Sequence, residues 1–293
     1  SSRPEKARMI ARRPDPGQAA WQLAVTDSIR DASELCDAIG LDPAARASAA
    51  AAADQYACRL PRRLLGGVGA GAADDPVLRQ FLPSGAELDS HAGYTTDPVG
   101  DLRAACATGL LRKYPGRALL ITTGACAVHC RYCFRRHFPY AEQTAGRDAW
   151  RGALAALADA ADVHEVILSG GDPLMLDDDR LAGLWRRLAA MPHLQRLRVH
   201  SRMPVVVPDR VTARLVALLA QPRFATSVVV HVNHADELAA DAVAALQRLR
   251  RGGVTVLNQS VLLRGVNDDA GTLAALSEAL VAAGALPYYL HMR

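Results

Sequence analysis

The sequence predicts an α/β fold, a partial (β/α)6 barrel of parallel strands preceded by an N-terminal helical region. Apolar strand-like runs alternate with amphipathic helical stretches from residue 118 onward, which is typical of parallel strands joined by crossover helices. Six such strands are too few for a complete eight-unit barrel. No G-x-G-x-x-G follows the first strand, so a partial barrel fits better than a nucleotide-binding sheet.

The first 112 residues form the expected helical region, and the barrel is expected over residues 113–293. A helix start is favoured at Asp42-Pro43 because proline suits the first helical turn. The elements expected before the barrel are helices over 15–39 and 42–56, a glycine-rich loop over 66–71, and short helices over 74–82 and before Tyr114. We expect this region to cover the barrel or to form a subunit contact.

The barrel elements follow from the alternation of short apolar runs and longer amphipathic stretches. The expected strands are Ala118–Thr122, Glu165–Ser169, Arg196–His200, Ser227–Val232, Thr255–Ser260 and Pro287–His291. The expected helices are Arg147–Ala160, Asp178–Ala190, Pro208–Leu219, Ala235–Arg251 and Ala270–Ala283. Active sites of barrels form from the loops at the carboxyl ends of the strands, so the functional side chains are expected there.

The composition bounds the class of protein. Of 293 residues, 50% are hydrophobic and 22% are charged, so the chain can form a sizeable core. The net charge of +4 is too small to indicate nucleic-acid binding by itself. No apolar stretch is long enough to span a bilayer, and the N-terminal residues contain no apolar signal core, so a cytoplasmic protein without a membrane partner is expected. A homo-oligomer is compatible with this composition.

Three of the six cysteines lie in one loop, directly after the first barrel strand. Cys126, Cys130 and Cys133 have the spacing C-x3-C-x2-C within TTGACAVHCRYCFRRHFPY, whereas Cys36, Cys58 and Cys106 are scattered. Three close thiolates can hold three irons of a cubane cluster and leave the fourth iron open. Zinc completed by His129 or His137 is an alternative that three cysteines fit less well, and buried free thiols are another.

This loop resembles the cluster loop of radical S-adenosylmethionine (SAM) enzymes. With FRRHFPY after it, the loop is similar to that of the lysine 2,3-aminomutases, and most similar to the branch that makes (R)-β-lysine for elongation factor P. The resemblance extends through LPRRLLGG, DDPVLRQFLP, YTTDPVGD, SGGDPLML, LRVHSRMPVVVP, HVNHADE, LNQSVLLRGVNDD and PYYLH. So many matches in the same order make chance agreement very improbable.

The resemblance implies an isomerase that converts L-lysine to β-lysine by 1,2-amino migration. It implies a [4Fe–4S] cluster, SAM and pyridoxal 5′-phosphate (PLP) as cofactors, and a functional link to elongation factor P and its lysyl ligase. Two other functions stay open. Arginine-rich stretches at 59–63, 186–187 and 248–251 could contact RNA phosphates in a radical SAM enzyme acting on RNA. A non-catalytic iron–sulfur protein would bind the cluster without cleaving SAM.

The resemblance also implies roles for loops at the strand ends. The run after the second strand would bind the SAM amino group, and it consists of Ser169, Gly170, Gly171, Asp172 and Pro173. Glycines let a backbone approach a ligand closely, although Gly-Gly-Asp-Pro also forms ordinary turns. His231 and Gln259 would contact SAM, and their alternative role is to cap the barrel strands. A metal site at His231 and His234 is disfavoured, because residues three apart on a strand point to opposite faces.

Arg135 would bind the carboxylate of the substrate lysine, a role that suits the planar fork of guanidinium donors. The alternative is a solvated basic patch with Arg131 and Arg136. Tyr114 corresponds to a contact with the PLP phosphate in the family, and Lys113 to a basic position beside it.

The sequence departs from the family in its lysines. It contains two, Lys6 and Lys113, and neither corresponds to the lysine that holds PLP as a Schiff base. In the family that lysine, like the acidic residues that bind the distal ammonium of the substrate, lies beyond the sixth strand. We therefore expect a chain truncated at its C-terminus. The alternative is a relative that has lost PLP chemistry.

Overall fold

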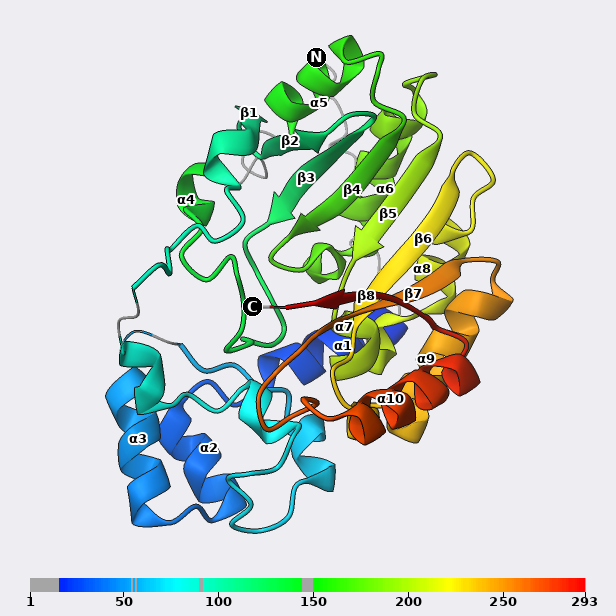
Figure 1. Cartoon of the computed structure of the whole chain (residues 1–293). Coiled ribbons are helices and arrows are strands. Elements are labelled where there is room, and N and C mark those ends of the chain that lie inside the picture. Colours follow the sequence, from blue (N-terminus) through cyan, green and yellow to red (C-terminus); the bar gives the residue numbers. More distant parts are fainter. Residues whose placement is uncertain (1–15, 54, 56, 90–91, 144–149, 293) are drawn as a thin grey trace, which may run out of the picture.

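The computed structural model describes residues 16–53, 55, 57–89, 92–143 and 150–292. Its centre is one curved sheet in which eight strands lie in sequence order (Figure 1). Six of these strands are parallel and form the partial barrel: β3 (Arg117–Thr123), β4 (Glu165–Gly170), β5 (Arg196–His200), β6 (Ala225–His231), β7 (Thr255–Val261) and β8 (Leu286–His291). The expected half-barrel architecture is confirmed, with every predicted strand within two residues of its observed bounds.

Helices follow the barrel strands β3 to β7, and the longer ones cover the outer face of the sheet. They are α4 (Tyr140–Gln143), α5 (Arg151–Asp159), α6 (Asp178–Ala189), α7 (Met203–Val206), α8 (Ala213–Leu219), α9 (Ala240–Arg251) and α10 (Ala270–Ala283). The sequence of α6 explains its position. The Asp177 carboxylate caps its first turn by accepting from the backbone N–H of Arg180, and Leu181, Leu184 and Leu188 form one buried stripe toward the sheet. Figure 1 shows α6 and α8 behind the strands.

The two faces of the sheet differ in chemistry. Residues that alternate along each strand, such as Leu120, Val166 and Val199, are buried in the hydrophobic core beneath the helices. The residues between them face the concave inner side. At the carboxyl ends of the strands these inner residues are polar: Ser169, His200, His231 and Gln259. Strand alternation therefore presents a polar row in the mouth of the half-barrel.

The N-terminal region contains three helices, α1 (Pro16–Thr26), α2 (Ala32–Ile39) and α3 (Pro43–Ala53). The helix expected over 15–39 is interrupted, because Ile29 pairs with Leu60 in an isolated β-bridge. Asp31 then caps α2 by accepting from the backbone N–H groups of Ser33 and Glu34. In Figure 1, α2 and α3 form a group at the lower left, apart from the sheet.

Short 3-10 turns complete this region and recur in the barrel loops. They are η1 (Arg62–Gly67), η2 (Leu78–Gln80), η3 (Gly85–Leu88), η4 (Leu102–Ala104), η6 (Pro173–Met175), η7 (Pro208–Arg210) and η8 (Ala235–Glu237). The helix expected over 74–82 is reduced to η2. In the described residues, no helix is both long and apolar enough to cross a bilayer.

The short helix expected before Tyr114 is wrong. After η4, the chain forms a hairpin of β1 (Ala105–Ala107) and β2 (Leu110–Tyr114), and β2 pairs antiparallel with β3. Gly109, with φ of +74°, supplies the left-handed backbone that the tight turn needs. Pairing satisfies the N–H and C=O groups on the free edge of β3, which a helix could not do. The expected domain boundary between 112 and 113 falls inside β2, and that division stays a prediction.

The strand β8 lies at the other edge of the sheet and is exposed along its whole length. Its exposed apolar side chains include Leu286, Tyr288 and Leu290. The barrel core therefore ends at β7, whose residues from Asn258 to Val261 are buried.

Candidate active site

The predicted site residues gather at one end of the half-barrel, in the loops that follow the carboxyl ends of the parallel strands. The cysteine loop follows β3, the Gly170-Gly171-Asp172 turn follows β4, and Ser201-Arg202 follows β5. His231 ends β6, and Gln259 lies near the end of β7. Parallel strand order brings these five loops to the same rim although they span more than 130 residues of sequence.

The three cysteines of the loop form no disulfide bond, and they differ in exposure. Cys126 and Cys130 are partly buried and Cys133 is exposed. Burial raises the pKa of the Cys126 thiol well above its usual range, and the nearby Asp172, Cys133 and Cys130 act in the same direction. The other two sulfurs therefore lie near enough to Cys126 to act on its charge. Positive charge from iron would offset this cost and favour the thiolates.

The geometry favours a cluster over a single zinc ion. Within the described ranges, no three His, Cys, Asp or Glu side chains converge as the ligands of one metal ion. A cubane binds each cysteine through a different iron, so its thiolates need not converge on one point. His129 uses its Nδ1 at the Ala57 carbonyl, 2.7 Å away, and burial lowers the pKa of this imidazole. The donor set therefore fits an iron–sulfur cubane with one iron left open.

The cysteine loop is held by arginines that the sequence left open as a solvated basic patch. Arg131 and Arg136 both pair with Glu87, and Arg136 Nη1 lies 2.6 Å from its Oε2. Arg131 also donates to the Arg79 carbonyl at 2.9 Å, and Arg59 donates to the Cys126 carbonyl at 2.8 Å. These contacts attach the loop to the N-terminal region, so a basic patch is the wrong interpretation of Arg131 and Arg136.

The two glycines after β4 are required by the neighbouring loop. Gly170 has φ of +123°, and a Cβ there would lie 2.5 Å from the Thr123 carbonyl oxygen. A Cβ on Gly171 would overlap the Ala125 carbonyl in the same way. The Gly171 N–H donates to Thr123 at 2.7 Å. Glycine is therefore needed for the close approach of this turn to the cysteine loop, whatever ligand the turn binds.

Asp172 and Pro173 complete this turn, and Asp172 is engaged by the protein itself. Its buried carboxylate accepts from Ser201 Oγ, from Arg202 N and from Leu174 N, all within 2.9 Å. Burial raises the pKa of Asp172, while these hydrogen bonds oppose the shift. Asp172 thus ties the turn after β4 to the loop after β5 and begins η6, in which Pro173 is the first residue.

Arg135 lies buried on the inner side of the barrel mouth. Its Nε donates to Asp101 Oδ2 at 2.7 Å and its Nη1 to Ser169 Oγ at 2.9 Å. Burial opposes ionisation of Asp101, but the charges of Arg135 and Lys113 outweigh it and lower the pKa of that carboxyl. Lys113 Nζ lies 2.5 Å from the other Asp101 oxygen. Asp101 therefore joins the two basic residues, and Arg135 does not belong to a solvated patch.

His231 and Gln259 lie side by side on the inner face, and their side chains are hydrogen-bonded. Burial lowers the pKa of His231 well below its usual range, so the imidazole is neutral. His200, one strand before, was not singled out from the sequence. Its ring lies 6.3 Å from that of His231, and its Nε2 is buried without a hydrogen-bond partner among the described residues. Its position at a strand end was the signal that could have identified it.

Other polar residues at the strand ends support the backbone. Asn258 and Ser260 both bind the Val232 carbonyl, and His234 caps η8. Asn258, Ser260 and His234 therefore satisfy backbone groups beside the strand ends. Tyr114 lies at the end of β2 and is 64% exposed, with the Arg117 guanidinium 5.7 Å from its ring centre. Tyr114 pairs with Arg117, the first residue of β3, so it lies at the amino end of the sheet and away from the rim that carries the cysteine loop.

Two of the three arginine-rich stretches, 59–63 and 248–251, make ion pairs and hydrogen bonds within the protein. Arg62 pairs with Glu34, and Arg63 pairs with Asp241 and donates to the Val205 carbonyl at 2.8 Å. Arg248 donates to the Val211 and Pro208 carbonyls, each at 3.2 Å. These contacts join helices and loops, as expected of structural arginines.

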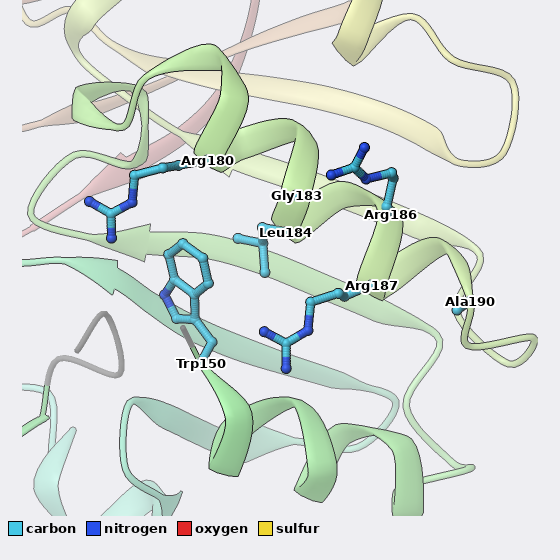
Figure 2. A pocket seen from close by; sticks show the side chains of 7 residues that line it. All are labelled: Trp150, Arg180, Gly183, Leu184, Arg186, Arg187 and Ala190. Atoms are coloured by element: carbon cyan, nitrogen blue, oxygen red, sulfur yellow. The ribbon is translucent and has the colours of Figure 1, made fainter. Parts of the chain in front are cut away.

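A groove on the outer surface is separate from this site. Figure 2 shows Arg180 and Arg187 of α6 directed toward the Trp150 indole. The groove between α6 and the start of α5 has a volume of about 540 Å³. Trp150 Nε1 donates to the Thr122 carbonyl at 3.1 Å, which anchors the ring. The groove belongs to the helical layer and contains none of the strand-end side chains.

Comparison with known proteins agrees with this geometry. Residues 120–276 match the model of the radical SAM superfamily. The L-lysine 2,3-aminomutase of Escherichia coli (strain K12) is 45% identical over 278 residues, which is 94% of this chain and 81% of the relative. The L-lysine 2,3-aminomutase of Haemophilus influenzae is 42% identical over 272 residues, 93% of this chain and 80% of the relative. The chain belongs to the radical SAM family of L-lysine 2,3-aminomutases.

One more distant aminomutase matches a shorter part of the chain. The L-lysine 2,3-aminomutase of Clostridium subterminale is 35% identical over 219 residues, 74% of this chain and 52% of the relative. Membership of the family makes this protein an enzyme of the isomerase class and implies a [4Fe–4S] cluster and SAM. Cys126, Cys130 and Cys133 form no disulfide bond and fit that cluster as its ligands.

PLP is also associated with lysine aminomutases, and the described residues offer only part of a site for it. Lys113 is paired with Asp101 and with the Val99 carbonyl, 2.6 Å away, so its amine is engaged. Lys6 lies outside the described residues. The described residues therefore include no lysine with an amine available to form a Schiff base with PLP.

Proposed function

We propose that this enzyme converts L-lysine to β-lysine by 1,2-amino migration. The observation that carries the proposal is the junction of Arg135 with Ser169 at the barrel mouth, next to the cysteine loop, in a chain that matches lysine aminomutases over nearly its whole length. A guanidinium on a buried inner surface is suited to a carboxylate ligand, because burial strengthens charge-assisted hydrogen bonds. Asp101 and Ser169 hold the guanidinium through Nε and Nη1.

The proposed roles divide among the loops. Cys126, Cys130 and Cys133 hold the cluster, which together with SAM supplies a carbon radical able to remove a hydrogen atom from the substrate. The turn from Ser169 to Pro173, with His231 and Gln259, contacts SAM. Arg135 orients the lysine carboxylate. The contact with the PLP phosphate that the resemblance implies for Tyr114 is not part of the proposal, because Tyr114 pairs with Arg117 at the amino end of β3.

The buried polar row explains how side reactions are limited. His200 and His231 are neutral, since burial lowers the pKa of both, and neutral imidazoles add no charge to the reaction space. The strands and loops around the row keep water away from a reactive radical.

The first test is anaerobic reconstitution with iron and sulfide, reduction, addition of SAM and quantification of 5′-deoxyadenosine. The matched control carries Cys126→Ala, Cys130→Ala and Cys133→Ala. We expect 5′-deoxyadenosine from the parent and none from the triple variant. In an enzyme that also carries the family's PLP lysine, adding L-lysine and PLP should then yield β-lysine. A parent that binds a cluster yet cleaves no SAM would contradict the proposal and favour a non-catalytic iron–sulfur protein.

We further infer that the product is (R)-β-lysine for the modification of elongation factor P through its lysyl ligase. The support is the resemblance of FRRHFPY and the upstream segments to that branch, together with the longer matches to the E. coli and H. influenzae proteins than to the clostridial one. Chiral chromatography of the product tests this inference. An (S) product would contradict it and leave the aminomutase activity unaffected.

A further inference from the structure

A buried arginine beneath the cysteine loop has no role in the function proposed so far. Arg202 follows β5, and its side chain is 5% exposed. Its backbone N–H donates to Asp172 Oδ2 at 2.8 Å, which fixes the start of the loop. Its guanidinium extends toward the cysteine loop, and Nη1 lies 3.0 Å from Cys130 Sγ.

Four other side chains hold this guanidinium in place. Nη2 donates to Gln80 Oε1 at 2.7 Å and to Glu237 Oε2 at 2.5 Å. Nη1 also contacts the Tyr132 hydroxyl, and the guanidinium carbon lies 4.6 Å from the centre of the Phe81 ring. Contacts on both edges and on the face leave little rotational freedom.

The partners of Arg202 are themselves fixed. Glu237 Oε1 accepts from the backbone N–H groups of Asn233 and His234, at 2.8 and 3.0 Å. Gln80 Nε2 donates to the same oxygen at 3.1 Å. Asn233 Nδ2 donates to the Tyr132 hydroxyl at 2.7 Å. Because the partners of the guanidinium are themselves fixed, the network is rigid, and it directs one donor at the sulfur.

The network is larger than charge compensation requires. One carboxylate suffices to neutralise one buried guanidinium, and Glu237 does so. Nη1 is nevertheless directed at a ligand sulfur. The Nε of Arg202 is also buried and has no hydrogen-bond partner among the described residues, so the guanidinium keeps a second donor for a group bound beside it.

We propose that Arg202 is a positioning residue that donates an N–H···S hydrogen bond to Cys130 and thereby raises the reduction potential of the bound cluster. The inference deepens the proposed function and rests on it, since it assumes that Cys130 binds the cluster. Hydrogen bonds and positive charge beside a ligand sulfur stabilise the reduced cluster, which carries one more electron. Arg202 thus makes the one-electron reduction, by an external reductant, more favourable.

The test is a potentiometric titration of the reconstituted cluster, followed by electron paramagnetic resonance. Arg202→Met removes the donor and the charge. At a fixed potential, we expect the ratio of reduced to oxidised cluster to fall about tenfold, which is 59 mV for a one-electron couple. Arg202→Lys keeps the charge but lacks the fork, so it should give a smaller shift.

The matched control is Arg223→Met, the same substitution at an arginine that donates to the backbone carbonyls of Ala189, Met191 and Leu194 and stacks on the Phe224 ring. It should leave the midpoint potential unchanged. A second variant, Arg202→Gln with Glu237→Gln, avoids leaving one buried charge unpaired. It should also lower the ratio, by less than Arg202→Met, because the loss of the Glu237 charge offsets part of the loss of the Arg202 charge.

The outcomes are distinct. Unchanged midpoints in both Arg202→Met and the double variant would overturn the proposal. It would also be overturned if both variants lost iron and sulfide while Arg223→Met kept them, because Arg202 would then be a structural support only. The midpoint is read without lysine, so a parent that binds a cluster but cleaves no SAM contradicts the proposed function and leaves the test of Arg202 intact.

Discussion

At the scale of single residues, the site is defined by side chains whose partners fix one orientation. Arg135 is held by Asp101 and Ser169, and His231 by Gln259. Neither partner of Arg135 is near it in sequence, since Asp101 lies 34 residues before and Ser169 34 residues after. Orientation of this kind reduces the entropy lost when a substrate binds.

Substitution of Arg135 should weaken substrate binding more than SAM cleavage. Loss of a charge-assisted hydrogen bond costs about 1.5–3 kcal/mol, so we expect Arg135→Gln to lower kcat/KM for lysine by roughly tenfold to a hundredfold. Uncoupled 5′-deoxyadenosine formation should persist. The control is Arg112→Gln, which breaks an ion pair with Asp162 on the outer part of β2. Equal losses in both variants would argue against a substrate contact.

The buried histidines predict acid sensitivity. Burial, with the charges of Arg198 and Arg135, lowers the pKa of His200 to about 3, whereas an unfolded histidine titrates near 6.5. Between these values the unfolded chain binds more protons, so the free energy of unfolding falls as the pH falls through this window. His200→Gln should reduce that slope by up to about 1.4 kcal/mol per pH unit, measured by urea denaturation at several pH values. Exposed His164→Gln is the control, and an equal change there would contradict the assignment.

At the scale of elements, function depends on how closely two loops approach. The turn after β4 packs against the cysteine loop after β3 through Gly170 and Gly171, without space for a Cβ. The strand register brings Ile121 opposite Ser169, just before both loops begin. Parallel pairing therefore sets the spacing between the cluster loop and the turn proposed to bind SAM.

A methyl group at this junction should be costly. We expect Gly171→Ala to lower the free energy of unfolding by about 1–3 kcal/mol through overpacking against the Ala125 carbonyl. Gly183→Ala is the matched control. Gly183 lies inside α6 with open space at its Cβ position, so alanine there should stabilise the helix by about 0.5–1 kcal/mol. Urea denaturation of both variants measures the difference, and the same sign in both would be contrary to expectation.

At the scale of the whole molecule, the N-terminal region and the barrel share one core. Trp21 of α1 is 3% exposed and lies against Arg210, whose guanidinium carbon is 4.9 Å from the ring centre. Glu87 and Arg59 bind the cysteine loop from the same region. The helical region thus supports the site directly, beyond covering the barrel.

Removal of the α1 anchor should destabilise the whole chain. We expect Trp21→Ala to lower the free energy of unfolding by about 3–5 kcal/mol, as for other large buried aromatic residues. Leu23→Ala in the same helix is the control, because Leu23 is 67% exposed and should change stability by less than about 0.5 kcal/mol. Circular dichroism in urea follows both variants. An unchanged barrel transition in Trp21→Ala would mean that the two regions unfold independently.

The sequence by itself determined the half-barrel and the cluster loop, because both depend on short-range patterns. Strand alternation, helix caps such as Asp177, and the spacing of Cys126, Cys130 and Cys133 are local. The hairpin of β1 and β2 was missed, since pairing with β3 outweighs the local helical preference. Only the tertiary structure decided which polar groups meet. Arg202 reaches Cys130 across 72 residues, a contact that depends on strand order and loop packing and leaves no periodic signal in the chain.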